Sequence, residues 1–444
     1  MKLSFPHPLL IMLFFVALAA FLTHLIPAGS YERVLDEGTG RMVVVEGSYR
    51  TVDATPVGLG QLFLSIPEGI IAGAEVVVLI LIIGGAFYLV EQTGAFQAGL
   101  ESLIRRFDQA TSYLLTLVGL LFGAAGVLNG LQEEIIAMVP VLMLLCRKIG
   151  YTRTAGVAIS LGSSLIGGAF GPANPFSVLI AQNLAELPLF SAAGFRLLLL
   201  AGALSFWIVY VIRTGKDPKF VAEPKEEVAR GLARHHAVIL LLVALTFGIL
   251  VFGLTRLDWD YNEMSALFFA MGLLCGLIGK LGWNGTAKAY TAGFAELVFA
   301  GVIVGLARSI YLVLEKGMII DSIIFGLFTP LEELPVALSA VGMLLAQALL
   351  HIPIPSTSGQ AVLTMPLLTP IADLIGLSRQ VMVLSYQYGA GIMDMVTPSN
   401  GGLMAILAAS GLSYKEWMAY AWKPILVIFL IALTGVLLGV FLGI

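Results

Sequence analysis

Residues 167–175 read Gly-Gly-Ala-Phe-Gly-Pro-Ala-Asn-Pro, and residues 389–401 read Gly-Ala-Gly-Ile-Met-Asp-Met-Val-Thr-Pro-Ser-Asn-Gly. Each cluster interrupts a long apolar stretch, 111–188 in the first case and 335–412 in the second. Glycine and proline break helices, whereas the residues on both sides are typical of apolar helices. Each stretch therefore predicts a helix that unwinds in its middle.

An earlier polar cluster interrupts each stretch as well. It reads Asn-Gly-Leu-Gln-Glu-Glu at residues 129–134 and Pro-Ile-Pro-Ser-Thr-Ser-Gly-Gln at residues 353–360. The simplest arrangement in a bilayer is a re-entrant hairpin with the earlier cluster at its tip, followed by a span that is unwound at the later cluster. Irregular backbone at membrane depth must be surrounded by protein or line a cavity. We therefore expect both tips and both breaks to meet at one place.

The composition is that of an integral membrane protein. Of the 444 residues, 59% are hydrophobic and 12% are charged, about half the charged share of a soluble domain. This composition excludes soluble enzymes and nucleic-acid-binding proteins, and it predicts the lipid bilayer as a partner. The net charge of −4 implies no polyanionic or polycationic partner. Cys146 and Cys275 lie in apolar stretches, so we expect no disulfide scaffold and no metal cluster.

Seven further apolar runs are each long enough to cross about 30 Å of hydrocarbon. They lie at residues 7–27, 73–93, 194–212, 237–254, 264–282, 293–315 and 420–443. Together with the two unwound spans, these runs predict an all-α polytopic membrane protein with about nine transmembrane helices and two re-entrant hairpins.

Basic residues orient this arrangement in the membrane. Arg105 and Arg106 precede the first hairpin and Arg147 and Lys148 follow it, which places both ends of the hairpin on one side. Lys and Arg concentrate on the cytoplasmic side of membrane proteins. We therefore expect a multi-pass protein of a bacterial-type inner (plasma) membrane, with the N-terminus and the basic linker at 213–236 in the cytoplasm.

The two interrupted stretches also align with each other. A shift of 226 residues matches prolines, glycines and asparagines without a gap: Pro140 with Pro366, Gly150 with Gly376, Pro172 with Pro398 and Asn174 with Asn400. Because the predicted topology gives the two copies opposite orientations, the pattern indicates the inverted repeat of secondary transporters.

The expected organisation follows from the spans and the repeat. It consists of a first span (1–27), an outer loop with a small β-hairpin and an interfacial helix (28–72), a first repeat (73–212), a cytoplasmic basic linker (213–236), linking spans (237–292) and a second repeat (293–444). The hairpin is expected to pair Tyr31–Leu35 with Met42–Val45 around a Glu-Gly-Thr-Gly turn.

Polar residues at the tips and breaks are candidates for substrate binding. Asn174 and Asn400 follow the two breaks, and Ser356, Thr357 and Ser358 lie at the second tip. Their side chains can bind substrate, or they can merely cap helix fragments. The oxygen atoms of Asn174, Asn400 and Ser358 can also ligate a Na⁺ ion.

Charged residues at membrane depth are expensive and usually functional. Glu133 and Glu134 at the first tip are candidates for binding a cationic group, carrying a proton or ligating Na⁺, and Asp394 is a candidate for contacting an ammonium group. Arg308 lies inside a span, where its planar fork can bind a substrate carboxylate or pair with an acidic residue. His351 is expected to pack between helices rather than to relay protons.

The Glu133-Glu134 tip, the Gly-Pro-Ala-Asn-Pro break, the Ile-Pro-Ser-Thr-Ser-Gly-Gln tip and the Thr-Pro-Ser-Asn break resemble the YfcC group of the DcuC-like carriers, in the ion transporter superfamily. The resemblance covers nearly the whole chain. It implies a homodimer in which a scaffold domain stays still while an elevator-type transport domain carries both hairpins. The resemblance leaves dicarboxylates, basic amino acids and short carboxylates open as substrates.

These observations predict a secondary transporter, either a symporter or an exchanger, for a small-molecule substrate. The favoured substrate is a small basic amino acid of the arginine or ornithine type, with Arg308 on its carboxylate and Glu133, Glu134 or Asp394 on its cationic groups. The alternative is a Na⁺-coupled or H⁺-coupled carrier of C4-dicarboxylates or short-chain carboxylates. No cofactor is expected, and Na⁺ and H⁺ both stay open as the coupling ion.

An enzyme is not expected. His351, Ser358 and Asp394 would have to form a nucleophilic site, but the sequence has no Gly-x-Ser-x-Gly elbow and no His-Glu-x-x-His zinc motif. A passive channel is also disfavoured, because paired broken helices that meet at the midplane are typical of alternating access.

Overall fold

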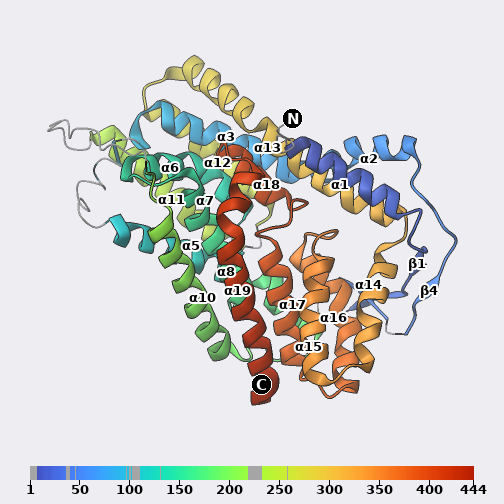
Figure 1. The fold of residues 1–444 in the computed structure, drawn as a ribbon. Coiled ribbons are helices and arrows are strands. Elements are labelled where there is room, and N and C mark those ends of the chain that lie inside the picture. Colours follow the sequence, from blue (N-terminus) through green and yellow to red (C-terminus); the bar gives the residue numbers. More distant parts are fainter. Residues whose placement is uncertain are drawn as a thin grey trace.

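The computed structural model shown in Figure 1 describes residues 8–36, 41–45, 47–96, 98–99, 102, 111–130, 132–218, 233–257 and 259–444. Its first half contains the helices α1 (Pro8–Leu22), α2 (Leu59–Ala72), α3 (Ala74–Gln92), α5 (Thr111–Asn129), α6 (Glu133–Ile149), α7 (Arg153–Val157), η1 (Ala158–Gly162), α8 (Ser163–Phe170), η2 (Pro175–Leu179), α9 (Ile180–Leu184) and α10 (Ala193–Thr214). Its second half contains α11 (Arg234–Arg256), α12 (Tyr261–Ile278), α13 (Gly282–Lys316), α14 (Ile320–Phe328), η3 (Thr329–Glu333), α15 (Val336–Leu350), α16 (Thr357–Leu374), α17 (Arg379–Met393), α18 (Gly401–Ala409) and α19 (Tyr414–Leu442). Arg105, Arg106 and most of the linker at 213–236, on which the predicted orientation partly depends, lie outside the described residues.

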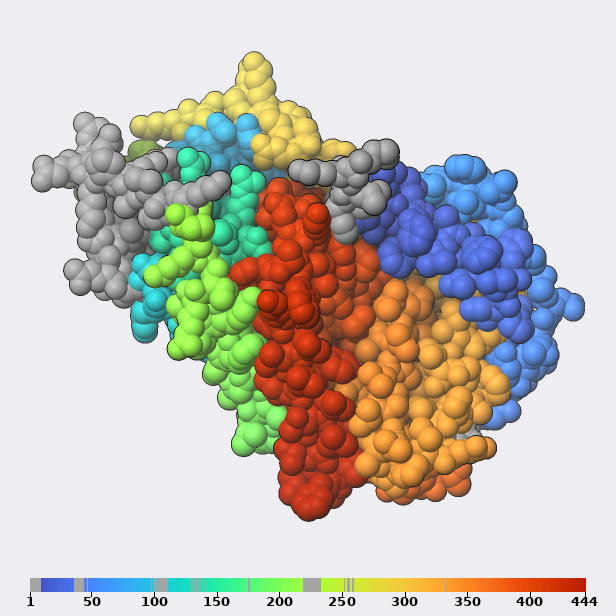
Figure 2. Space-filling view, in the orientation of Figure 1, coloured from blue at the N-terminus to red at the C-terminus, as the bar shows by residue number. Residues whose placement is uncertain are grey.

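Six helices of the described residues are long and apolar enough to cross a membrane: α3, α5, α10, α12, α13 and α19. In α19, for example, only 33% of the most apolar window is buried, and Leu430, Leu437 and Phe441 are exposed. Figure 2 shows α19 (red) as a ridge across one face of the molecule. Exposed apolar surface of this extent is typical of helices that face lipid. The chain is therefore a mostly helical, multi-pass membrane protein.

Each of the seven predicted apolar runs overlaps a helix, namely α1, α3, α10, α11, α12, α13 and α19. The bounds differ most at α13, which begins at Gly282 and has 35 residues. The short helix α14 and the turn η3 that follow α13 have no counterpart among the predicted spans.

The two predicted tips lie between α5 and α6 and between α15 and α16. Gly130 turns the chain at the first tip with a φ of +63°, a conformation that suits glycine. The arms of each tip contact other helices more extensively than each other: α5 packs on α8, α6 on α3 and α18, α15 on α17, and α16 on α17 and α9. Each tip is thus an open turn rather than a tightly packed hairpin.

The two predicted breaks separate α8 from η2 and α17 from α18. The segment before the first break contains the π-helix η1, where Trp207 Nε1 donates a hydrogen bond of 2.8 Å to Ala158 O. A helix that widens in this way frees a backbone carbonyl for a side-chain donor.

Element boundaries follow the offset of 226 residues that the sequence predicts. Arg153 begins α7 and Arg379 begins α17, while Gly150 and Gly376 have φ angles of +77° and +72° after α6 and α16. The helix starts and turns therefore recur at the predicted offset, and the inverted repeat itself stays a prediction.

The outer loop carries two strand pairs, β1 (Gly29–Ser30) with β4 (Arg50–Thr51) and β2 (Arg33–Asp36) with β3 (Arg41–Val44). The second pair overlaps the ranges predicted for the hairpin and extends one residue beyond each, to Asp36 and Arg41. The loop is attached to α14, because Asp321 accepts hydrogen bonds from Tyr31 N at 2.9 Å and Arg33 Nη2 at 2.7 Å. Helix α2 follows the loop, where the sequence predicts an interfacial helix.

Close contact between α5 and α8 positions the first break. A Cβ atom on Gly126 would lie 1.9 Å from Ser164 O, and one on Gly167 would lie 2.1 Å from Gly123 O. These contacts are with backbone atoms, which cannot rotate away, so the close approach of the two helices requires glycine at both positions.

We therefore predict that Gly126→Ala forces α5 and α8 apart and lowers the free energy of unfolding by about 1–3 kcal/mol, as overpacking does. Thermal denaturation of the purified protein in mild detergent measures the effect. Gly202→Ala in α10 is the matched control, because a Cβ there meets nothing within 4 Å, and its effect should stay within about 0.5 kcal/mol. Equal melting temperatures for the two variants would contradict the predicted contact.

Candidate functional site

A cavity of about 60 Å³ has lining residues from both tips and both breaks. The tips contribute Gly130, Gln132 and Thr357, and the breaks contribute Gly168, Ala169, Asn174, Gly391 and Asp394. The other lining residues are Ser164, Leu165, Phe176, Ser177 and Gln387. A larger recess of about 430 Å³ between α15 and α19 is lined by apolar side chains and one hydroxyl, Thr434, and so offers little for polar recognition.

Four helix ends border this cavity. Gly168 belongs to the last turn of α8 and Gly391 to the last turn of α17, whereas Thr357 begins α16 and Phe176 belongs to the first turn of η2. Carbonyl groups at C-terminal helix ends attract cations, and N–H groups at N-terminal ends attract anions. The cavity therefore has surfaces suited to both signs of charge.

Asp394 is the one charged side chain among the described residues that line the cavity. Its Oδ1 atom accepts a hydrogen bond of 2.5 Å from Asn400 Nδ2 and lies 2.8 Å from His351 Nε2. Both contacts involve Oδ1, so the described hydrogen bonds leave Oδ2 available to a ligand.

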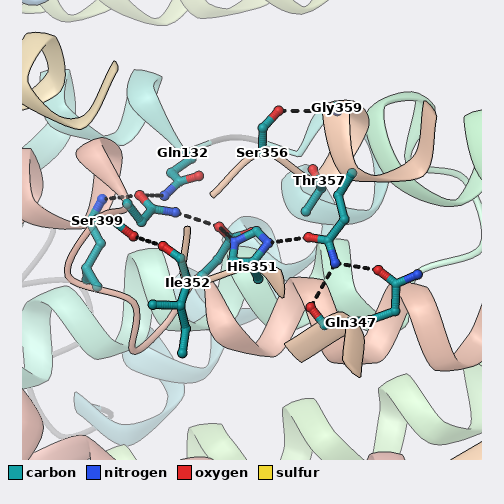
Figure 3. A network of polar contacts seen from close by, with 12 residues as sticks. Gln132, Gln347, His351, Ile352, Ser356, Thr357, Gly359 and Ser399 are labelled. Carbon is teal, nitrogen blue, oxygen red and sulfur yellow. Dashed lines mark hydrogen bonds and ion pairs between the residues drawn. The ribbon is translucent and has the colours of Figure 1, made fainter. Parts of the chain in front are cut away.

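Asn400 connects this carboxylate to the first tip. Its Oδ1 atom accepts one hydrogen bond of 2.8 Å from Leu403 N, which caps α18, and another of 2.7 Å from Gln132 Nε2. Figure 3 shows Gln132 and Ser399 on one side of His351 and Gln347 on the other. The network thus joins the first tip, the second break and the second tip.

Gln387 holds the first break. Its Nε2 atom donates hydrogen bonds of 3.1 Å to Gly168 O and 2.7 Å to Gly171 O, two carbonyls at the end of α8. On the other side of the break, Asn174 Oδ1 accepts a hydrogen bond of 2.8 Å from Phe176 N and caps η2. Asn174 Nδ2 also donates to Gly126 O at 3.0 Å.

A buried arginine lies behind Gln387. Arg196 is fully buried, and it donates hydrogen bonds from Nε to Gln387 Oε1 at 3.0 Å and from Nη1 to Ser191 O at 2.7 Å. In the described part of the chain, no carboxylate forms an ion pair with this side chain. A buried cation that is paired only with neutral acceptors is costly. Its positive charge therefore adds to the field at the first break.

The roles of Arg196 and Gln387 and the polar contacts of His351 were not predicted from the sequence. The available signals were a charge inside the apolar run at 194–212 and two glutamines, Gln380 and Gln387, seven residues apart on one face of α17. Arg196 lies near the start of that run, where the sequence alone does not distinguish a basic residue at the membrane surface from a buried one.

The structure brings some of the predicted site residues together. Asn174, Thr357 and Asp394 line the cavity, and Asn400 contacts Asp394 directly. Ser356 is exposed and caps α16 through a hydrogen bond of 3.2 Å from Gly359 N.

Other predicted residues lie elsewhere. Ser358 is half-buried and is not among the lining residues. Arg308 is exposed, and its guanidinium lies 5.3 Å from the centre of the Tyr311 ring, so it does not reach the cavity in this conformation. Helix α6 begins at Glu133, but the side chains of Glu133 and Glu134 lie outside the described residues.

The described residues do not fit the expected Na⁺ site. Both lone pairs of Asn400 Oδ1 accept N–H donors, and Asn174 Oδ1 already caps η2. Asn174, Asn400 and Ser358 therefore do not offer a set of free oxygen atoms to one ion. The described part of the chain also contains no group of three or more His, Cys, Asp or Glu side chains that can hold a metal ion.

Comparison with known proteins identifies relatives over almost the full length. The family model of the DcuC C4-dicarboxylate anaerobic carriers matches residues 5–441. A Haemophilus influenzae protein described as uncharacterized is 27% identical, with 95% of this chain and 94% of that protein covered. A protein of Escherichia coli K12, which carries the provisional name basic amino acid antiporter YfcC, is 28% identical, with 94% of this chain and 92% of that protein covered.

Two solved transporter structures cover nearly the whole chain at low similarity. The YdaH transporter of Alcanivorax borkumensis has a TM-score of 0.45 and 16% identity, with 99% of both chains covered. The MtrF protein of Neisseria gonorrhoeae has a TM-score of 0.43 and 15% identity, with 99% of this chain and 96% of that chain covered.

We predict that a cysteine at Thr357, in a background with Cys146→Ala and Cys275→Ala, reacts faster with cationic aminoethyl methanethiosulfonate than with anionic sulfonatoethyl methanethiosulfonate. The Asp394 carboxylate attracts the cationic reagent, and an attraction of about 1 kcal/mol corresponds to a rate ratio of about five. Mass spectrometry of the intact protein measures the rates, each normalised to the same reagent's rate with free cysteine. Thr364→Cys is the control and should react slowly, because Thr364 is fully buried. Equal normalised rates of the two reagents at Thr357→Cys would contradict the predicted charge preference.

Proposed function

Since the chain belongs to the family of DcuC C4-dicarboxylate anaerobic carriers, it is a membrane transporter of the DcuC and YfcC type, and we propose that it carries a small basic amino acid across the inner membrane. Arginine and ornithine are the basic amino acids that we propose as substrates. The provisional name of the E. coli relative is in line with this proposal. Transport is driven by exchange or by a coupled ion, without ATP.

The observation that carries the proposal is the charge of the cavity. Asp394 is its one charged side chain among the described residues, and no described lysine or arginine lines it. A dicarboxylate would bring two negative charges against this carboxylate, and the described lining offers no lysine or arginine to balance them. A guanidinium or ammonium group instead gains a charge-assisted hydrogen bond to Asp394.

The helix ends around the cavity support a substrate that carries both charges. The cationic group is assigned to Asp394 and to the last turns of α8 and α17, while the substrate carboxylate is assigned to the first turns of α16 and η2. This assignment replaces Arg308 as the carboxylate partner, because Arg308 is exposed on another part of α13.

The size of the cavity limits what it can hold in this conformation. A volume of about 60 Å³ has room for roughly four to six water molecules. It accommodates the charged end of a basic amino acid but not the whole molecule. A tip must therefore move when the complete substrate binds, and we propose that Glu133 and Glu134 add negative charge on the side of the first tip.

An elevator movement is also proposed. One hydrophobic cluster joins α3, α11 and α12 with Tyr290 of α13, and it is separate from the larger core that contains both broken helices. Helix α18 packs on α13, where a Cβ atom at Gly401 would lie 3.1 Å from Val304 Cα. We assign α3, α11 and α12 to the scaffold and the tips and broken helices to the moving body.

Counterflow of labelled arginine or ornithine in proteoliposomes tests the substrate class, with succinate and malate as the competing class. We predict that Asp394→Asn raises the half-saturation concentration for the basic amino acid by roughly tenfold to a hundredfold, because a hydrogen bond between charged groups contributes about 1.5–3 kcal/mol. Asp373→Asn is the matched control, because Asp373 forms a surface ion pair with Arg379. Counterflow of succinate or malate without counterflow of any amino acid would support the dicarboxylate function that the family description suggests.

We predict that a disulfide between Val304→Cys and Gly401→Cys, in the background without native cysteines, stops transport. The bond should form on mild oxidation because the two positions are in contact, and a reductant should restore counterflow. The two single-cysteine variants, oxidised in parallel, are the controls. Full transport by the cross-linked protein would argue against sliding between α13 and α18.

A further inference from the structure

The buried imidazole of His351 lies between two hydrogen-bond acceptors. Nδ1 lies 2.9 Å from Gln360 Oε1, and Nε2 lies 2.8 Å from Asp394 Oδ1. The ring is fully buried and sits at the C-terminal end of α15. A neutral imidazole has one N–H donor and one acceptor nitrogen, so it satisfies both contacts only if one neighbour presents a donor instead.

The orientation of Gln360 excludes a donor on the Nδ1 side. Gln360 Nε2 donates a hydrogen bond of 2.8 Å to the backbone carbonyl of Gln347. A carbonyl can only accept, so the amide cannot be reversed without facing two oxygen atoms against each other. Gln360 therefore presents Oε1 to the ring, and His351 Nδ1 must carry a proton.

The orientation of Asn400 determines the Nε2 side in the same way. The backbone N–H of Leu403 donates to Asn400 Oδ1, so Asn400 turns its Nδ2 donor toward Asp394 Oδ1. Asp394 Oδ1 thus accepts a short hydrogen bond from an amide, which favours the ionised carboxylate. A proton must then lie between this oxygen and His351 Nε2, because two lone pairs at 2.8 Å would repel each other.

We propose that His351 is an imidazolium paired with the Asp394 carboxylate, and that this pair is the site of the coupling proton. The proposal rests on the proposed function for its substrate. It also changes the expectation that His351 only packs between helices. The C-terminal carbonyl groups of α15 add to the stabilisation of the positive ring.

The other titratable groups near the pair are few in the described residues. Tyr386 of α17 donates from its hydroxyl to Thr357 O at 2.6 Å, and Tyr414 of α19 donates to Val396 O at 2.5 Å. Helices α8, α15 and α18 have no acidic or basic side chain, and Asp373 lies at the far end of α16. Glu133 and Glu134 are the further acidic residues at the first tip, and their side chains lie outside the described residues.

Substrate and proton compete for Asp394 in this arrangement. When a guanidinium or ammonium group binds the carboxylate, the Nε2–H bond breaks, the proton leaves to water, and His351 becomes neutral while its Nδ1–H bond to Gln360 remains. One positive charge replaces another, so the total charge of the pair and its ligand is unchanged. The exchange makes the protein an antiporter of protons and cationic substrate.

Loss of the proton also changes the connection between the tips. The hydrogen bond between His351 and Asp394 joins the second tip to the second break. Asn400 bonds to Asp394 and to Gln132, and so extends this chain of hydrogen bonds to the first tip. Without a proton, the lone pairs of His351 Nε2 and Asp394 Oδ1 repel each other. The carboxylate then turns toward the substrate, and the second tip is no longer bonded to the second break.

Nitrogen-15 NMR of the purified full chain, labelled at histidine, tests the charge of the ring directly. We expect a doubly protonated His351 ring at neutral pH without substrate, and a neutral ring at saturating arginine or ornithine. The signal is assigned by its loss in His351→Gln. His24→Gln is the control, because His24 is exposed and contacts Val57 O in the outer loop.

Calorimetry in two buffers of different ionisation enthalpy measures the protons released by arginine or ornithine. We expect about one proton per bound molecule, and an apparent Kd that rises about tenfold for each unit by which the pH falls while the pair is protonated. In His351→Gln this slope should disappear. If the variant does not fold, the NMR and calorimetric measurements on the unmodified protein still decide the proposal.

The outcomes separate this inference from the proposed function. A neutral ring in the protein without substrate would overturn the proton site. Binding of arginine or ornithine without proton release, and with a doubly protonated ring, would overturn the coupling and leave the amino-acid function standing. A doubly protonated ring with no binding of either amino acid would overturn the proposed substrate and support the proton site.

Discussion

The structure depends on how the backbone groups at the two helix breaks find hydrogen-bond partners. A membrane interior offers no water to a freed carbonyl or N–H group, so each group must be satisfied by the protein or by a cavity. Gln387 supplies the donors for the end of α8, and Asn174 caps the helix that follows. At the second break, Trp417 donates to Met395 O and Asn400 caps α18. Asn174 and Asn400 cap helices two and three residues further along the chain, whereas Gln387 lies 219 and 216 residues from the two carbonyls that it satisfies, so the first break depends on the assembled fold.

The same partners determine the chemistry of the cavity. The side chains that bond to the free backbone groups at the breaks are polar and lie close to the helix ends. They therefore surround the space between those ends. Asp394 adds one negative charge to the cavity. Arg196 does not line the cavity, and it donates a hydrogen bond to Gln387, which does. A cationic group can therefore approach a carboxylate directly, whereas the described lining offers an anion only neutral N–H and hydroxyl donors. His351 Nε2 lies 2.8 Å from Oδ1 of the same carboxylate, so the ring that we propose as the proton site borders the place where a cationic substrate group would bind.

The sequence located the tips and breaks well because their signals are local. Glycine, proline and asparagine clusters inside apolar stretches mark points where a helix cannot continue, whatever the rest of the fold does. It predicted side-chain roles less well. Arg308 was predicted to bind the substrate carboxylate because it is a charge inside an apolar run. Its guanidinium instead lies over Tyr311 on an exposed part of α13. Arg196 had the same kind of signal and is fully buried against Gln387. Only packing distinguishes the two arginines, since a helix presents every direction to its neighbours.

The sequence by itself determined the class of the molecule, the positions of its apolar runs and the four clusters that interrupt them, because hydrophobicity and helix-breaking residues act over short distances. The tertiary structure decided which atoms meet. The pairing of His351 with Asp394 joins positions 43 residues apart, and that of Gln132 with Asn400 joins positions 268 residues apart. The directions of the side-chain amides in this network depend on the groups that the fold places beside them, as Gln347 O, which can only accept, directs the Gln360 amide. Such directions arise from folded geometry, and no local pattern in the sequence encodes them.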